Sequence, residues 1–245
     1  KRAADLLKQM TLEEKIAQMT MHQLEGFKNR PEGYGVCESP FIDVHAIARQ
    51  SYHTKKYARE NTRLGIPPFQ IAECLHGLLA FGATIFPQAI AQGSTWNPDL
   101  IREMGKAIGH EANAVGVDQA LSPLFDLIID PRFGRVEECL GEDPYHVAHM
   151  GGAFVTGMQE KVMCTAKHFA GYSVPAGGIN LGPSSLGERE MRSLHLFPFE
   201  YAVKKANIFS VMPSYNEVDG IPAHASKWLL DKVLRKEWGF KGYVF

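Results

Sequence analysis

The sequence predicts an α/β protein with a parallel sheet, and among such folds a TIM-type (β/α)8 barrel. From residue 65 onward, short apolar runs alternate with longer segments whose apolar residues recur at helical spacing. Polar or aromatic residues directly follow several of these runs. Chemistry in α/β barrels lies at the carboxyl ends of several strands, whereas an open doubly wound sheet gathers its ligand groups at one switch point. The distributed polar strand ends therefore favour the barrel.

Length and composition agree with this fold class and exclude others. The 245 residues are 45% hydrophobic and 22% charged, and α/β barrels typically have about 250 residues. Because 26 Lys+Arg face 27 Asp+Glu, no charge excess indicates a nucleic-acid partner. No apolar run approaches the roughly 18 residues of a membrane span. The four cysteines form no CxxC pair, so a zinc or redox site is disfavoured.

The chain begins with helical patterns. Leu6, Leu7 and Met10 share one helical face, and Thr11 with Glu14 forms a capping box that can start a second helix. Gly and Pro among charges predict an irregular loop over residues 26–40. Five apolar runs then predict buried parallel strands, at residues 69–72, 117–121, 162–166, 208–212 and 243–245. Three helices between them are expected to start at the N-caps Asn97, Asp143 and Ser226.

Several strand-end residues are candidates for binding. Lys167 and His168 follow one strand, and a lysine is expensive to bury unless it binds something, so ligand and structural roles rate about even. His168 and Glu73, which follows another strand, each fit a core or a ligand role. In the charged segment 121–144, loop charges are expected to pair among themselves, namely Asp130, Arg132, Glu138 and Glu142. Arg135 differs, because Gly134 allows close approach and a guanidinium suits sugar hydroxyls or a carboxylate.

Other site signatures are missing. No GxGxxG follows a strand, no GxxxxGK[ST] occurs, and the ten histidines contain no HExxH. His146 and His149 share a helix face without an acidic partner, which favours a surface or capping role. We therefore expect neither a metal nor a cofactor.

Nine segments together resemble the N-terminal domain of glycoside hydrolase family 3, the β-glucosidase and β-xylosidase family. They read MTLEEKIAQM (10–19), AECLHG (72–77), FPQAI (86–90), TWNP (95–98), DPRFGRVEE (130–138), GEDPY (141–145), AKHFAG (166–171), VMPSYN (211–216) and LRKEWGFKGYV (234–244). These segments are distributed along nearly the whole chain and occur in the family's order. The resemblance implies a barrel that holds a terminal sugar at its strand ends. Matching family positions, it implies substrate-binding roles for Glu73, Arg135, Lys167, His168, Met212 and Tyr215.

The resemblance also implies what this chain lacks. A retaining exo-β-glycosidase releases the non-reducing terminal sugar by double displacement with two carboxyl groups. The family's nucleophilic aspartate is expected two positions beyond Phe245, and the acid/base on a later α/β domain. Hence we expect no catalytic carboxyl group here, and family position argues against Asp126, Asp130 and Glu137. Residues 1–245 are then a partial barrel domain, inactive alone, whose partners are a β-linked glycoside and the rest of the same enzyme.

Alternatives stay open at this point. A non-catalytic carbohydrate-binding or scaffold segment would keep the same sugar-binding residues without turnover. A metal- or nucleotide-dependent barrel enzyme lacks both a ligand cluster and a phosphate loop. Glu73, longer than the aspartate of many relatives, gives pentoses some weight, so glucoside, xyloside and arabinoside all remain. The compartment is equally open, because periplasmic, secreted and cytoplasmic locations all fit.

Overall fold

The computed structural model describes residues 2–23 and 30–245. Seven strands form one parallel sheet in chain order: β1 (Met21–Gln23), β2 (Val36–Glu38), β3 (Phe69–Ala72), β4 (Gln119–Ala120), β5 (Met163–Phe169), β6 (Ser210–Pro213) and β9 (Tyr243–Val244). A small antiparallel hairpin pairs β7 (Glu217–Val218) with β8 (Ile221–Pro222). Consecutive parallel neighbours with helical crossovers are the topology of an α/β barrel.

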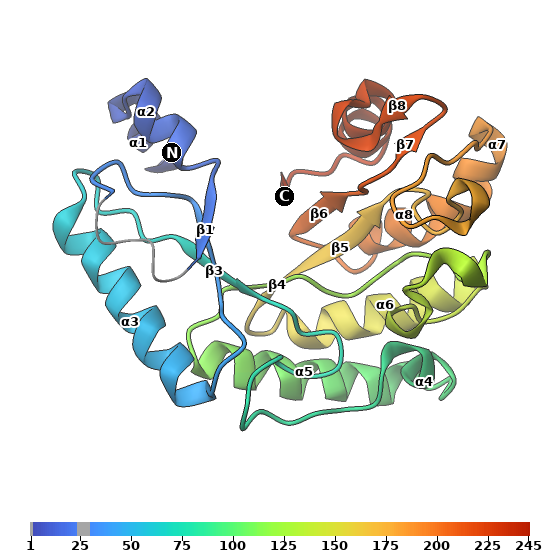
Figure 1. Cartoon of the computed structure of the whole chain (residues 1–245), viewed down its shortest axis with the longest axis horizontal. Coiled ribbons are helices and arrows are strands. Elements are labelled where there is room, and N and C mark those ends of the chain that lie inside the picture. Colours follow the sequence, from blue (N-terminus) through green and yellow to red (C-terminus); the bar gives the residue numbers. More distant parts are fainter. Residues whose placement is uncertain (1, 24–29) are drawn as a thin grey trace.

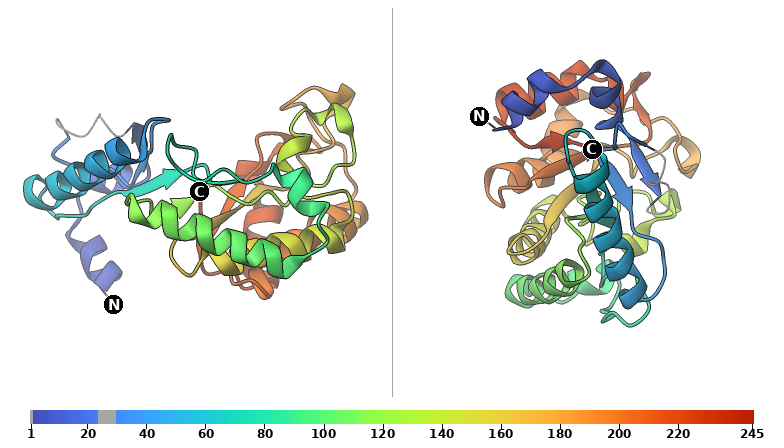
Figure 2. Two further views of the ribbon diagram at one scale, coloured as in Figure 1. Left: turned by 90° about the horizontal axis from the view of Figure 1, so that it is seen from below. Right: turned by 90° about the vertical axis from the view of Figure 1, so that its left-hand side faces the viewer.

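Helices connect these strands. Those in the described part of the chain, besides short 3-10 turns, are α1 (Arg2–Gln9), α2 (Leu12–Ala17), α3 (Val44–Asn61), α4 (Ala89–Gly93), α5 (Pro98–Ala114), α6 (Pro144–Met158), α7 (Glu188–Glu190), α8 (Phe197–Lys204) and the π-helices Met191–His195 and Trp228–Glu237. Figure 1 shows the sheet curling into a half-barrel, with α3, α5, α6 and α8 on its convex side, and Figure 2 shows the same curl from two other directions. The predicted parallel α/β fold class is confirmed.

The predicted strands and caps are largely found. All five apolar runs contain a strand, and the capping box of Thr11 and Glu14 is present in full. Asn97 Oδ1 accepts a hydrogen bond from Leu100 N at 3.1 Å, and Asp143 Oδ1 accepts one from His146 N at 2.7 Å. Ser226 Oγ accepts from Leu229 N at 3.2 Å, although the helix that follows is of the π type.

Two predicted boundaries are wrong. The described part of the expected irregular loop over 26–40 contains strand β2. The sequence does not predict this strand, because it has three residues and only Cys37 is fully buried, so no apolar run marks it. Residues 26–29 lie outside the described residues. Strand β5 continues to Phe169, so Lys167 and His168 lie within it and not after it. Both side chains are buried there, and the sequence does not predict that a polar pair at this position is buried.

Buried apolar residues of the described chain lie both outside the sheet, where the largest cluster is, and inside its curl. Outside, α5 and α6 pack so closely that a Cβ added to Gly105 would lie 2.6 Å from Phe154 O, and one on Gly109 would lie 2.8 Å from Met158 O. Inside, Ile71, Leu121 and Met212 form a buried apolar cluster. Among the described residues, no helix is both long and apolar enough to cross a bilayer.

Candidate active site

A cluster of charged side chains lies at the carboxyl ends of three strands of the curled sheet. Glu73 follows β3, Lys167 and His168 occupy the second half of β5, and Tyr215 follows β6. Arg135 comes from the long connection after β4, between two short 3-10 turns. Carboxyl ends of parallel strands meet at one edge, which is why residues distant in sequence converge here.

Lys167 and Glu73 form the most buried ion pair that includes a lysine in the described structure. Lys167 Nζ lies 2.8 Å from Glu73 Oε1 and 3.0 Å from Oε2. The exposed fraction of the lysine side chain is 2%, against 28% for the glutamate. A buried ammonium costs several kcal/mol unless it is paired, so this pair satisfies the lysine while leaving the carboxylate reachable from solvent.

Beside this pair, four side chains form a continuous chain of hydrogen bonds. Asp126 Oδ2 lies 2.7 Å from His168 Nδ1 and 3.1 Å from its backbone N. His168 Nε2 lies 3.2 Å from Arg135 Nη1. Arg135 then binds Glu138 in bidentate fashion, through Nε to Oε1 at 2.6 Å and Nη2 to Oε2 at 2.7 Å. The chain runs from the buried Asp126 to the half-buried Arg135–Glu138 pair.

Burial and pairing shift the pKa values in this chain. Burial lowers the pKa of His168 below its ordinary value, although Asp126 acts in the opposite direction. Burial also disfavours both charges of the Arg135–Glu138 pair, but their hydrogen bonds and mutual attraction dominate. The pKa of Arg135 is therefore raised and that of Glu138 lowered. Near neutral pH the site thus holds a neutral imidazole beside an ionised guanidinium–carboxylate pair.

Aromatic rings form a wall next to His168. The His168 ring lies 4.9 Å from the Tyr172 ring and 5.5 Å from the Tyr215 ring, measured between centroids. Tyr172 is buried and its hydroxyl donates to Asn180 Oδ1 at 2.6 Å, whereas Tyr215 is 56% exposed. Burial raises the pKa of Tyr172. Charged donors beside an exposed aromatic ring are a combination suited to sugars, which present hydroxyls at their edges and C–H groups on their faces.

The structure brings together five of the six residues expected to bind substrate. Contacts join Glu73 to Lys167, and Arg135 to His168 and through it to Tyr215. Met212 belongs instead to the apolar cluster inside the sheet. These placements leave the substrate-binding role of all six a prediction.

Sequence reasoning missed part of the network and judged part of the charged loop correctly. Asp130 pairs with Arg132 at 2.8 Å as expected of loop charges. Glu138 also pairs within the segment, but its partner is Arg135 and the pair is half-buried. Family position argues against Asp126 as a catalytic group, but a single carboxylate within the apolar stretch LFDLII indicates a buried polar residue that needs a partner. Tyr172 carried no comparable signal.

The histidines of α6 have structural partners. His146 Nε2 lies 2.9 Å from Gly93 O, and His149 Nδ1 lies 2.9 Å from Tyr145 O. Across residues 2–23 and 30–245, no group of three His, Cys, Asp or Glu side chains is arranged to hold a metal ion.

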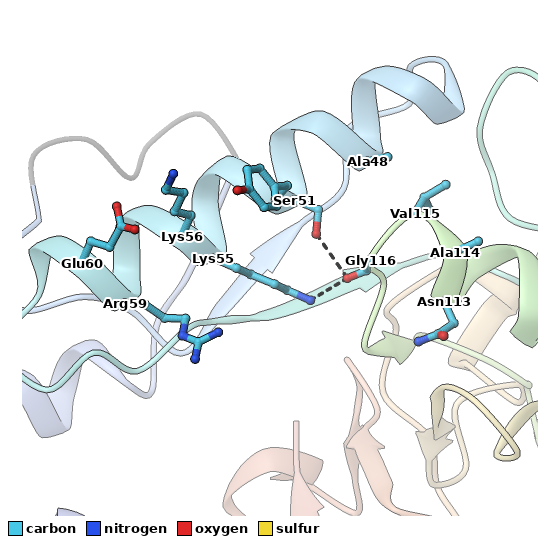
Figure 3. Close-up of a pocket in the computed structure, with 11 residues that line it drawn as sticks. Ala48, Ser51, Lys55, Lys56, Arg59, Glu60, Asn113, Ala114, Val115 and Gly116 are labelled. Atoms are coloured by element: carbon cyan, nitrogen blue, oxygen red, sulfur yellow. Dashed lines mark hydrogen bonds between the residues drawn. The ribbon is translucent and has the colours of Figure 1, made fainter.

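A surface groove lies away from the charged cluster. A groove of about 830 Å³ separates α3 from the end of α5, and Figure 3 shows Lys55, Lys56 and Arg59 along its α3 side. Lys55 Nζ donates to Gly116 O at 2.7 Å and pairs with Asp118 Oδ2 at 2.6 Å. Gly116 and Asp118 precede β4, so the groove lies toward the amino ends of the strands, away from the charged cluster.

Comparison with known proteins now identifies the family. The model described as "Glycosyl hydrolase family 3 N terminal domain" matches residues 11–245. The chain belongs to glycosyl hydrolase family 3. A β-xylosidase from Formosa agariphila is 40% identical over 100% of this chain and 31% of its own length. A periplasmic β-glucosidase from Salmonella typhimurium is 32% identical over 97% of this chain and 32% of its own length.

Solved structures of family members agree in fold. A β-glucosidase from Erythrobacter marinus superposes with a TM-score of 0.94 at 38% identity, covering 99% of this chain and 35% of that one. A β-glucosidase from Listeria innocua in complex with glucose gives a TM-score of 0.87 at 31% identity, covering 99% and 36%. This chain therefore spans about a third of the length of these relatives.

Proposed function

We propose that the protein containing this chain is a retaining exo-β-glycosidase that releases a terminal sugar from a β-glucoside or β-xyloside. The observation that carries the proposal is the pairing of Lys167, buried to 2% exposure, with the accessible Glu73 at the carboxyl edge of the sheet. Matching relatives are named β-xylosidase and β-glucosidase. Residues 1–245 would be part of the N-terminal barrel domain.

In this proposal the cluster holds the non-reducing terminal ring. Lys167 and Arg135 donate hydrogen bonds to hydroxyl oxygens, Glu73 accepts from hydroxyl protons, and Tyr215 packs on the ring. His168 completes the polar side, and Met212 forms an apolar part of the pocket wall. The hydrogen bonds that Glu73 accepts strengthen as positive charge develops on the sugar in the oxocarbenium-like transition state, because the hydroxyl protons become more acidic.

The two reacting carboxyl groups are proposed to lie outside residues 1–245. The nucleophilic aspartate would follow Phe245 by two positions and attack the anomeric carbon, giving a covalent glycosyl-enzyme. The acid/base would come from a later domain, protonating the leaving oxygen first and activating water second. Within this chain, the carboxylate of Asp126 pairs with His168, and that of Glu138 pairs with Arg135.

Trapping the covalent intermediate tests the reaction type. The full-length protein would be incubated with a 2-fluoro glycoside and its intact mass measured, followed by paired assays with aryl glucoside, xyloside and arabinoside. A mass increase of one fluorosugar per protein, located on the aspartate after Phe245, supports the proposal. Sugar binding without turnover or labelling would instead identify a non-catalytic carbohydrate-binding protein.

A further inference from the structure

The hydrogen-bond chain through His168 fixes where the imidazole proton lies. Arg135 Nη1 faces His168 Nε2 at 3.2 Å. A guanidinium nitrogen in proteins only donates hydrogen bonds, so Nε2 must offer its lone pair and carry no proton. A neutral ring then has its single proton on Nδ1, and burial, which lowers the pKa of His168, favours the neutral ring.

Asp126 is the group that accepts this proton's hydrogen bond. Its Oδ2 lies 2.7 Å from Nδ1 and also accepts from the His168 backbone N–H at 3.1 Å. The side chains of His168 and Asp126 are 1% and 2% exposed, so solvent cannot replace either partner. Asp126 therefore holds both the imidazole ring and the backbone of His168.

The other two protonation states of the His168 ring are unfavourable. With the proton on Nε2 alone, two donors would face each other at 3.2 Å, and the Nδ1 lone pair would face a carboxylate at 2.7 Å. With both nitrogens protonated, a buried cation would lie against Arg135 and near Lys167, the two charges that oppose its formation. Only the Nδ1–H form satisfies every contact.

We propose that Asp126 is a positioning residue that holds His168 in the Nδ1–H form, so that Nε2 accepts from Arg135 and, together with Glu138, orients the guanidinium. Glu138 binds Nε and Nη2 while His168 binds Nη1, so the guanidinium is held at all three nitrogens. For sugar binding the inference rests on the proposed function. It assigns His168 the role of an acceptor in the site and leaves donation to Arg135 and Lys167.

The proton position can be measured without any activity. Full-length protein with 15N-labelled histidine would be studied by NMR near pH 7, with the His168 signals assigned by their loss in His168→Gln. We expect an Nδ1 of the protonated type and an Nε2 of the unprotonated type. A proton on Nε2, in either the neutral or the doubly protonated ring, would overturn the inference.

A double-mutant cycle tests whether Asp126 acts through His168. Asp126→Asn, His168→Ala and the double variant would be compared by calorimetric binding of glucose and xylose and by kcat/KM. Asp126→Asn keeps the side-chain shape but removes the charge, and we expect about a tenfold loss, as for one charge-assisted bond. In the His168→Ala background the same change should cost almost nothing.

Controls separate this inference from the proposed function. Asp130→Asn is the control, because Asp130 lies in the same segment as Asp126 but pairs with Arg132. This variant should bind sugar as tightly as the wild type. Equal losses from Asp126→Asn in both backgrounds, or none in either, would show that Asp126 does not position His168. If the wild-type protein neither binds nor hydrolyses a glycoside, the proposed function fails, while the His168 proton position still decides this inference.

Discussion

The charged cluster at the strand ends and the groove between α3 and α5 contain lysine–carboxylate pairs of nearly equal length and unequal burial. Lys167 lies 2.8 Å from Glu73, and Lys55 lies 2.6 Å from Asp118. The exposed fraction of the Lys167 side chain is 2%, whereas that of Lys55 is 26%. Distance therefore does not distinguish the two pairs, and burial does.

The difference shows why cavity size alone does not identify the site. The open groove has a volume of about 830 Å³, yet its charges remain partly hydrated and their attraction is screened by water. Lys55 is already satisfied by Asp118 and Gly116 O. At the strand ends, burial strengthens each electrostatic contact and makes an unpaired charge costly. A ligand that engages Glu73 and Lys167 gains from that environment.

Lys167→Met should have the largest effect of any change in this comparison. Truncating one partner of a buried, hydrogen-bonded charge pair costs about 2–5 kcal/mol, so kcat/KM on an aryl glycoside should fall roughly 30- to 5,000-fold. The matched variant Lys55→Met makes the same substitution in the groove, and it should change kcat/KM by less than about twofold. Steady-state kinetics on the full-length protein measures both. Equal losses from the two variants would contradict the assignment of the site to the strand ends.

A strand beside Lys167 could be predicted from the sequence, whereas the continuation of β5 through Lys167 to Phe169 and the environment of the lysine could not. A lysine beside a short apolar run already indicates a strand end, which is where α/β barrels place ligand groups. Its partner Glu73 is 94 residues away, and the pairing depends on the register of β3, β4 and β5. Asp126 meets His168 across 42 residues for the same reason, through the contact of Leu124 with Lys167. Spacing along one chain does not specify such registers.

A similar limit applies to the fold. The run Phe69–Ala72 is apolar enough to be recognised, and it becomes β3 with the predicted bounds. Strand β2 has one fully buried side chain, Cys37, between two half-buried neighbours. It is held in the sheet by parallel pairing with β1 and β3 and not by a hydrophobic signal of its own. Tertiary pairing therefore determines the short strands that local pattern misses.

Arg135→Lys tests geometry within the strand-end cluster. Lysine keeps the charge but cannot bind Glu138 through two parallel bonds while also donating to His168. We expect kcat/KM to fall about 10- to 150-fold, as for a loss of about 1.5–3 kcal/mol. Arg132→Lys is the control, since Arg132 forms an exposed pair with Asp130 in the same segment, and its kcat/KM should stay near wild type. Similar losses in both variants would show that only the charge of the segment matters.

Two buried histidines should make stability fall in mild acid. Burial lowers the pKa of both His168 and His195 in the folded protein. As the pH drops through about 6.5, the unfolded chain binds protons that the native state resists, so the free energy of unfolding decreases until the lowered native pKa values are passed. Urea unfolding from pH 8 to pH 5 measures this. His195→Phe should flatten the decline, whereas His53→Gln, at an exposed position, should leave it unchanged; an unaltered decline in His195→Phe would contradict the interpretation.

The groove should give the smallest effect, and on stability alone. A partly exposed ion pair such as Lys55–Asp118 contributes about 0–1 kcal/mol, so Lys55→Met should lower the free energy of unfolding by no more than that. The small difference from wild type should shrink further as the salt concentration rises, because solvent ions screen exposed charges. Urea unfolding of both proteins at low and high salt measures it. A loss of several kcal/mol that persists at high salt would mean that the groove pair is held as tightly as Lys167 and Glu73, and burial would then not be what separates the two regions.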